Sequence, residues 1–126
     1  MKKIIATEKA PKAIGPYSQA VNVGNMIFIS GQIPLDPVSM EITGNTAPEQ
    51  AEMVFKNIAE ILREAGCGFE HIVKTTVYLK DIADFAGVNE VYARHFTGEY
   101  PARAAFAVAA LPRNALVEIE AIAVKE

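Results

Sequence analysis

The sequence is short of the residues that build disulfides, metal cages and membrane spans. Its 126 residues include one cysteine, two histidines and no tryptophan. A single cysteine cannot form an internal disulfide, and it excludes a metal site made of several thiolates. No apolar run approaches the roughly 18 residues that cross a bilayer, and the apolar stretch near the N-terminus is too short for a secretory signal. We therefore expect a cytoplasmic protein with no membrane partner.

Clustered positive charge is also missing. Lys and Arg total 12, whereas Asp and Glu total 15, which gives a net charge of −3. The longest basic run is Lys2-Lys3, but a nucleic-acid surface needs clustered cations to neutralise phosphates. The charge pattern therefore disfavours a nucleic-acid partner and still allows a single anion pocket. Hydrophobic residues make up 51% of the chain, which predicts one folded domain over residues 1–126.

What is present begins with strand patterns. Alternation and β-branched residues predict strands over residues 18–23 and 26–33, and Gly24-Asn25 between them is a two-residue hairpin signal. Residues 34–48 are rich in turn formers and are predicted to form a loop. The first third of the chain is therefore expected to be a hairpin followed by a long connection.

Two segments have helical periodicity. Thr46 and Glu49 form a T-x-x-E capping box at the start of an apolar stripe, which predicts a helix over residues 46–66. Residues 84–96 carry a second apolar stripe and predict a second helix, although the interior Gly87 weakens that prediction.

Three further strands are predicted, over residues 71–81, 103–111 and 115–124. The order of elements is that of an α+β protein, with a mixed sheet of about six strands and two helices packed on one face. The last strand is apolar on both faces, which is typical of a strand that is covered on both sides. Because a chain of this length has no third layer, we predict a homo-oligomer whose subunits meet sheet to sheet.

Common catalytic motifs are absent from the sequence. It has no G-x-S-x-G, no phosphate-binding glycine loop, no H-E-x-x-H and no C-x-x-C. His71 near a strand end, His95 near a helix end and Cys67 between two glycines are each better explained as structural residues.

Arg103 is the exception, because it precedes a run of small and apolar residues. An arginine is seldom buried without a partner, and a guanidinium binds a carboxylate through two parallel hydrogen bonds. Strand alternation places Arg103 on one face with Ala105, and it places Phe106 on the other face, which we expect to lie toward the helices. The partner is then a ligand carboxylate or, in the structural alternative, Glu118 or Glu120.

The distance between Arg103 and Glu118 depends on how the last two strands pair. We expect them to form a hairpin around Arg113, in which Arg103 and Glu118 lie ~13 Å apart along the strands and do not meet within one chain. Across a subunit boundary they can meet. This geometry favours a site shared between copies of the chain.

Four stretches of the sequence carry a family resemblance: IGPYSQAV, SGQIP, IVKTTVYLKD and PARAAFAVAALPRNALVEIEAIAV. In them the chain resembles the RidA/YjgF family of reactive-intermediate deaminases nearly from end to end. The resemblance implies a chorismate-mutase-like trimer whose sheets face a central barrel, with each site between two subunits. It also implies hydrolysis of reactive 2-imino acids or enamines (2-iminobutanoate and 2-iminopropanoate) to 2-keto acids and ammonia, without a cofactor or a metal.

The resemblance also assigns roles to single residues. The arginine of P-A-R falls on Arg103 and would hold the substrate carboxylate, the glutamate of V-E-I falls on Glu118 and would orient or activate water, and the tyrosine of G-P-Y falls on Tyr17, near the imine. The other positions that the resemblance places around the pocket are Ser30, Gly31, Asn89 and Pro112. Many members have a cysteine where this chain has Ala105, so we expect a roomier pocket and no thiol-dependent behaviour.

Two other functions remain open from the sequence. Ala105 leaves room for a catalytically silent module that binds small carboxylates or regulates a partner protein. A ribonuclease or translation inhibitor, a label that some relatives carry, is disfavoured by the acidic net charge.

Overall fold

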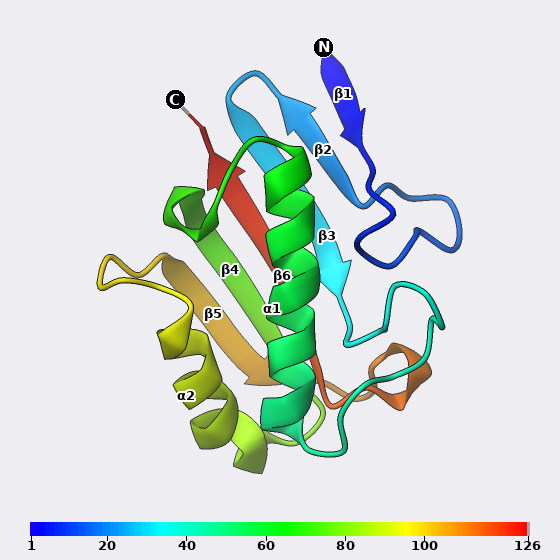
Figure 1. Ribbon diagram of the computed structural model, residues 1–126. Helices are drawn as coiled ribbons and strands as arrows, with labels where there is room; N and C mark the ends of the chain where they lie inside the picture. Colours follow the sequence, from blue (N-terminus) through cyan, green and yellow to red (C-terminus); the bar gives the residue numbers. More distant parts are fainter. Residues whose placement is uncertain (126) are drawn as a thin grey trace.

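A mixed sheet of six strands carries two α-helices on one of its faces in the computed structural model, which describes residues 1–125 (Figure 1). The strands are β1 (Lys2–Ile5), β2 (Ala20–Val23), β3 (Met26–Gln32), β4 (Ile72–Leu79), β5 (Ala102–Ala107) and β6 (Val117–Val124). The helices are α1 (Ala47–Glu64) and α2 (Phe85–Arg94), with short 3₁₀ turns at η1 (Phe69–His71), η2 (Ile82–Asp84) and η3 (Pro112–Asn114). The predicted α+β class, the mixed sheet and the placement of both helices on one face are confirmed.

The first three strands form an antiparallel meander. The predicted hairpin is confirmed, because β2 and β3 pair from Val23↔Met26 onward across a turn whose Gly24 has a φ of 59°. The sequence patterns did not predict β1. It is short, it contains two exposed lysines, and its partner in β2 lies about twenty residues away in the sequence.

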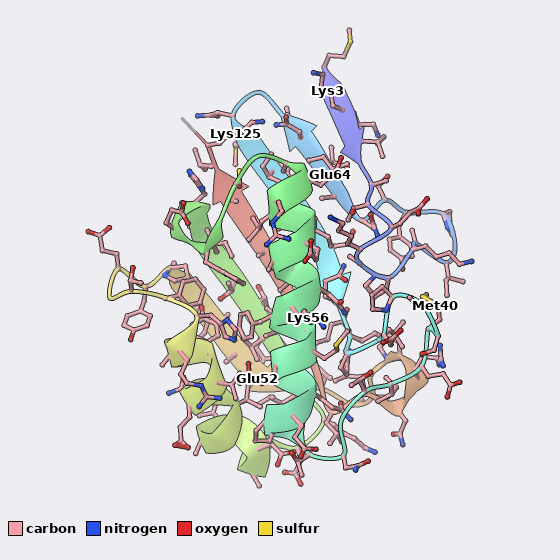
Figure 2. The ribbon with its side chains drawn as sticks, viewed as in Figure 1. Lys3, Met40, Glu52, Lys56, Glu64 and Lys125 are labelled. Atoms are coloured by element: carbon pink, nitrogen blue, oxygen red, sulfur yellow. The ribbon has the colours of Figure 1, made fainter. Side chains whose placement is uncertain are left out.

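α1 begins where its capping box predicts. The Thr46 hydroxyl accepts a hydrogen bond from the Glu49 amide at 3.3 Å, and the Glu49 carboxylate accepts one from the Thr46 amide at 3.3 Å. The apolar side of the helix packs on the sheet, while the charged residues Glu52, Lys56 and Glu64 lie on the outer side (Figure 2). An amphipathic helix of this kind covers one face of a sheet and leaves the other face to be covered by something else.

α2 lies beside α1, and its interior glycine has a packing reason. A Cβ at Gly87 would approach the Pro48 ring to 2.8 Å, so glycine lets the start of α2 lie against the first turn of α1. Farther along, Phe55 of α1 packs against Tyr92 and Phe96 with ring centroids 5.7 and 6.4 Å apart. The glycine that weakened the helix prediction is therefore a contact point between the two helices.

The predicted hairpin of the last two strands is wrong. β4 lies between β5 and β6, and β5 pairs with β4 in parallel, with Thr75 opposite Arg103. β6 pairs with both β3 and β4 and occupies the middle of the sheet. Its residues on the helix side are buried, whereas Ile122 and Val124 on the other face are only partly buried in the single chain.

The predicted orientation of β5 is also wrong. Arg103 and Ala105 do share a face, but that face is turned toward the helices, where Ala105 packs against the core. Phe106 lies on the uncovered face, where it is 45% exposed and its ring packs edge-on against Tyr78 at 5.4 Å. The physical reason is space, because small alanines on the helix side of β5 leave room for the aromatic side chains of α2.

The face of the sheet opposite the helices has no covering layer within residues 1–125. Large apolar side chains on it remain partly exposed, among them Met26, Phe28, Val73 and Phe106. An uncovered apolar sheet face is typical of a subunit interface, so the homotrimer stays a prediction that this surface favours. No described helix is long and apolar enough to cross a membrane.

Candidate active site

The site residues predicted from the sequence form two separate groups on opposite faces of the sheet. The first group, here called the Glu118 half-site, lines a cavity of about 480 Å³ and comprises Tyr17, Ser30, Gly31, Pro112 and Glu118. The second group, called the Arg103 half-site, contains Arg103 and Asn89 and lines a cavity of about 500 Å³. Ala105 follows Arg103 on the same face of β5 but lines neither cavity.

The backbone of β3 makes room for the Glu118 carboxylate. β3 pairs with β6 as Ile29↔Ala121 and next as Gln32↔Ile119, so one extra residue forms a bulge at Ser30 and Gly31. A Cβ on Gly31 would overlap the Glu118 carboxylate. Glycine at this position is therefore what allows the acid to lie across the bulge.

A loop held by one buried glutamine brings Tyr17 to the Glu118 half-site. The Gln19 side chain is only 4% exposed, and its amide nitrogen donates to the carbonyls of Thr7, Ala10 and Pro11 at 3.0, 3.2 and 2.7 Å. The Tyr17 ring is left half exposed at the cavity. Its hydroxyl accepts a long hydrogen bond of 3.4 Å from the Ile14 amide and can still donate to a ligand.

The other walls of the Glu118 half-site come from Ser30 and the η3 turn. The Ser30 hydroxyl donates to the Ser18 carbonyl at 2.6 Å, which ties β3 to the loop that carries Tyr17. Pro112 begins η3, in which Arg113 and Asn114 have φ values of 57° and 58°. These two left-handed residues turn the chain sharply just before β6 and place Pro112 beside the cavity.

The Glu118 side chain of this half-site lies in surroundings that suit a proton donor or acceptor. It is half-buried, and burial raises the pKa of its carboxyl above the usual value, with a further rise from the negative charge of Glu120. A carboxyl whose pKa is moved toward neutral pH is suited to general acid–base work. Such a group can hold or release a proton beside a reacting nitrogen or water.

Aromatic rings and one amide position Arg103. Its guanidinium carbon lies 4.7 Å from the centre of the Tyr92 ring and 5.3 Å from that of Phe85, and its Nη1 donates to the Asn89 side-chain oxygen at 2.7 Å. The Tyr92 ring is itself fixed by a hydrogen bond of 2.6 Å between its hydroxyl and that of Thr75. A guanidinium stacked in this way keeps its remaining N–H donors available for a planar carboxylate.

The structural alternative for Arg103 is not found within the described chain. Among residues 1–125, no ion pair joins Arg103 to Glu118, Glu120 or any other carboxylate. Arg103 faces the helices and Glu118 faces the opposite way, with β4 between their strands. The two half-sites are thus too far apart to act on one small molecule within a single chain, as the sequence predicted, although the predicted hairpin register was wrong.

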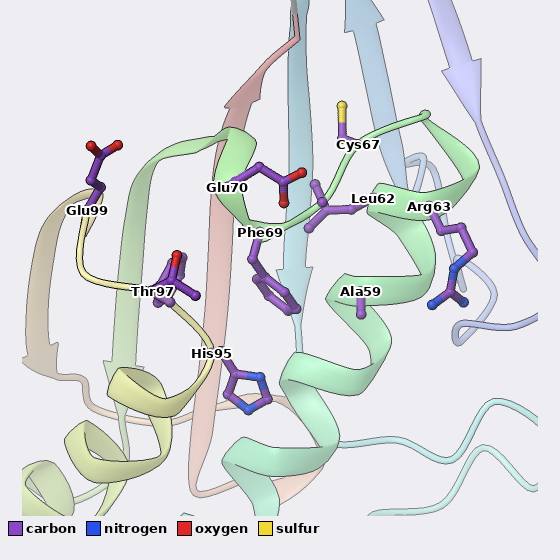
Figure 3. A pocket seen from close by; sticks show the side chains of 11 residues that line it. Ala59, Leu62, Arg63, Cys67, Phe69, Glu70, His95, Thr97 and Glu99 are labelled. Carbon is purple, nitrogen blue, oxygen red and sulfur yellow. The ribbon is translucent and has the colours of Figure 1, made fainter.

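A larger cavity lies elsewhere and is lined by none of the predicted site residues. It measures about 680 Å³ and lies between α1 and the segment after α2, with Phe69, His95 and Cys67 around it (Figure 3). The His95 ring stacks on Phe55 at 4.4 Å and its Nε2 is 3.0 Å from a Glu52 oxygen, and burial raises the pKa of the Cys67 thiol. These contacts agree with structural roles for His95 and Cys67.

Within residues 1–125, no three His, Cys, Asp or Glu side chains lie close enough together to hold a metal ion.

Three residues beside the site were not predicted to belong to it, namely Tyr78, Glu120 and Tyr92. The V-E-I-E alternation does place Glu120 on the face of Glu118, and Tyr92 belongs to the apolar stripe over residues 84–96. Neither pattern predicts which site residue each of these three side chains lies beside.

Comparisons with known proteins identify the family. A family model described as Endoribonuclease L-PSP matches residues 7–125. The chain belongs to this family. The chain is 56% identical over 125 residues to the mouse protein named 2-iminobutanoate/2-iminopropanoate deaminase, a match that covers 99% of this chain and 93% of the mouse protein.

Solved structures of L-PSP family members have the same fold as this chain. The crystal structure of RidA from Psychrobacter is 49% identical and superposes with a TM-score of 0.94, covering 98% of this chain and 99% of the other. The crystal structure of Escherichia coli TdcF with bound serine is 44% identical, with a TM-score of 0.92 and coverage of 98% and 99%. The resemblance to RidA proteins and the chorismate-mutase-like fold are therefore confirmed.

Proposed function

We propose that this protein is a 2-iminobutanoate/2-iminopropanoate deaminase, which hydrolyses the C=N bond of reactive 2-imino acids to give 2-keto acids and ammonia. The mouse relative that matches nearly the whole chain carries this name. The observation that carries the proposal is the chemistry of the two half-sites. One presents an arginine with unused N–H donors, suited to a carboxylate, and the other presents an acid–base group in a cavity next to a tyrosine hydroxyl.

The active unit is a homotrimer, and each site is shared between two subunits. Two observations support this part of the proposal. The half-sites face opposite sides of one sheet, and β5, which carries Arg103, is an edge strand that a neighbouring subunit can approach. The exposed apolar residues of the uncovered face provide a surface for assembly, with the sheets facing a central barrel.

In the reaction, Arg103 of one subunit binds the substrate carboxylate through two hydrogen bonds, and this fixes C2 of the imine near Glu118 of the next subunit. Because a protonated imine is already electrophilic, the attacking water has to be positioned more than it has to be activated. Glu118 orients that water and takes a proton from it, and Tyr17 lies near the imine nitrogen. Ser30, Gly31 and Pro112 shape the walls of the cavity.

The carbinolamine formed by water then collapses to products. The C–N bond breaks, its electron pair stays on nitrogen, a proton from Glu118 completes ammonia, and the hydroxyl oxygen becomes the keto oxygen as its proton passes to solvent. The side chains supply orientation and proton transfer, and no cofactor or metal enters these steps. Ala105 lacks a thiol, so a main-chain carbonyl in this part of β5 is the group left to hold the water on the Arg103 side.

The proposal is tested by following keto-acid and ammonia release while 2-iminobutanoate is generated in the assay. We expect acceleration over buffer, and we expect Arg103→Ala to lower kcat/KM by about a hundredfold or more, since orientation by the guanidinium is lost. The variant should keep the oligomeric state of the parent in light scattering. Wild-type trimers that do not accelerate the reaction would overturn the proposal, and an active Arg103→Ala would overturn the carboxylate-binding role.

A binding module for small carboxylates is the second candidate, favoured by the TdcF structure, which has bound serine. Calorimetric titration with serine or 2-oxobutanoate separates it from the enzyme, because a module binds without turnover. The ribonuclease named in the family description is disfavoured by the net charge of −3, and RNA binding with a steep salt dependence would revive it. A cytoplasmic location stays a prediction.

A further inference from the structure

A tyrosine and a second acid complete one wall of the Glu118 half-site. Glu118 and Glu120 both lie on the uncovered face of β6 and line the same cavity, roughly 7 Å apart along the strand. On the neighbouring strand, Tyr78 lies opposite Glu118 and its hydroxyl donates to the Glu120 carboxylate. The Phe106 ring packs edge-on against Tyr78 and limits the movement of the phenol.

The two acids have different partners. Glu120 is held by the Tyr78 hydroxyl, whereas Glu118 accepts no hydrogen bond from any residue in 1–125. The hydrogen bond to Glu120 raises the pKa of Tyr78 to about 12, so the phenol keeps its proton and continues to donate. A carboxylate that receives such a bond is stabilised in its charged form, and a neighbouring carboxyl without one is the member of the pair that takes up a proton.

We propose that Glu120, anchored by Tyr78, is a positioning residue for the deaminase reaction, whose fixed negative charge helps Glu118 to hold the proton that it takes from water until the C–N bond breaks. This inference rests on the proposed function, because it assigns that proton to the departing amine. The balance of the step is simple. Glu118 gives the proton that it took from the attacking water to the carbinolamine nitrogen, the C–N bond breaks and ammonia leaves, the hydroxyl proton passes to solvent as the keto group forms, and Glu118 is again a carboxylate.

No other charged group of the described chain neutralises this pair. On the uncovered side of β4, the Lys74 ammonium lies 3.4 Å from the Thr76 hydroxyl, and the Lys80 ammonium donates to the Asn114 side chain at 2.6 Å. Arg113 in η3 forms no ion pair with either acid, and β3 contributes Ser30 and Gly31 to the cavity without a charge. Tyr17 is the remaining titratable side chain that faces the cavity. The charge of Glu120 thus acts on Glu118 without a cation between them.

Glu120→Gln tests the proposal, because glutamine keeps the size of the side chain and an oxygen for Tyr78 but loses the charge. We expect the acidic limb of the pH profile of kcat/KM to move to lower pH, because Glu118 loses the repulsion that held its proton and stays a carboxylate, ready to accept a proton from water, down to lower pH. Tyr78→Phe keeps the charge without its anchor and should move the limb less, in the same direction. Glu64→Gln on the outer side of α1 removes an equal charge and should leave the profile unchanged.

Carbon-13 NMR titration of the Glu118 carboxyl gives a readout that does not depend on turnover. In glutamate-labelled trimers, its midpoint should fall to lower pH in Glu120→Gln and stay constant in Glu64→Gln. An unchanged midpoint would overturn the inference even in an active enzyme, and so would a shifted midpoint with an unchanged pH profile. Trimers that show the shifted midpoint but no turnover in any variant would instead overturn the proposed function.

Discussion

The Glu118 half-site and the Arg103 half-site are shaped by different parts of the chain. Backbone shapes the first, through the bulge of β3, the missing Cβ at Gly31 and the left-handed residues of η3. Side chains shape the second, where Tyr92 and Asn89 of α2 hold the guanidinium of Arg103. Each half-site is therefore held in place by contacts within one chain, although neither is a complete site. Assembly of the subunits has only to bring the two half-sites together.

The largest expected effect comes from mixing two inactive variants, one for each half-site. Arg103→Ala and Glu118→Ala each remove one half-site, and each homotrimer should lose activity by about a hundredfold. Co-expressed at equal levels, they should recover about a quarter of wild-type activity, because a shared site in a mixed ring receives both intact residues about one time in four. Rates of keto-acid formation in the purified mixed trimers measure the recovery. A site built within one chain would give no recovery at all.

Adding one methyl group should damage the half-site that backbone shapes. Gly31→Ala puts a Cβ where the Glu118 carboxylate lies, so the acid must move and kcat should fall between roughly tenfold and a hundredfold. Gly68→Ala is the matched control, since its Cβ would meet the Glu70 carboxylate far from both half-sites. Steady-state kinetics decide the matter, and equal losses in the two variants would contradict a specific role for Gly31.

Removing a ring should damage the half-site that side chains shape. Tyr92→Leu takes away the face on which Arg103 lies, and we expect KM to rise roughly three- to tenfold. Tyr92→Phe keeps that face but leaves the buried Thr75 hydroxyl without its partner, so it should cost about 1–2 kcal/mol of unfolding free energy with little change in KM. Urea unfolding and substrate kinetics on both variants separate the two effects. A rise in KM for Tyr92→Phe equal to that for Tyr92→Leu would count against the stacking role.

Local signals predicted the elements well and their long-range pairing poorly. The capping box of α1 and the Gly24-Asn25 turn act within a few residues, and both are confirmed. The position of β6 between β3 and β4 depends on contacts between strands far apart in the sequence, which alternation does not encode. The orientation of Phe106 was missed for the same reason, since a period of two says which residues share a face but not which face the helices cover.

The candidate site shows the same contrast between local sequence signals and long-range contacts. Sequence motifs placed Arg103, Glu118 and Tyr17 in a site through family resemblance, and the structure locates them in two half-sites. The bulge at Ser30 is invisible in the sequence, because one extra residue in a strand leaves the composition of the segment unchanged. The contact between Tyr78 and Glu120 joins positions 42 apart, which no local pattern links.

The smallest expected effect concerns the helix layer that supports the Arg103 half-site. Glu52 of α1 bonds to Arg94 and His95 at the end of α2, and these hydrogen bonds lower the pKa of its carboxyl below the usual 4.5. Glu52→Gln should therefore cost at most about 1 kcal/mol at neutral pH, since the group is nearly half exposed and screened by solvent.

The pH dependence of this loss follows from the direction of the shift. A lowered pKa in the folded protein stabilises it above the unfolded value, and this contribution disappears as the pH falls through the folded value. Urea unfolding of wild type and Glu52→Gln should differ at pH 7 and converge at acid pH once Glu52 is protonated in the folded protein, whereas Glu64→Gln, an exposed change on the same helix, should follow wild type throughout. A difference that persists at low pH would show that Glu52 supports α2 by packing and not by charge, and the Arg103 half-site would then tolerate acid better than the ion pair between Glu52 and Arg94 suggests.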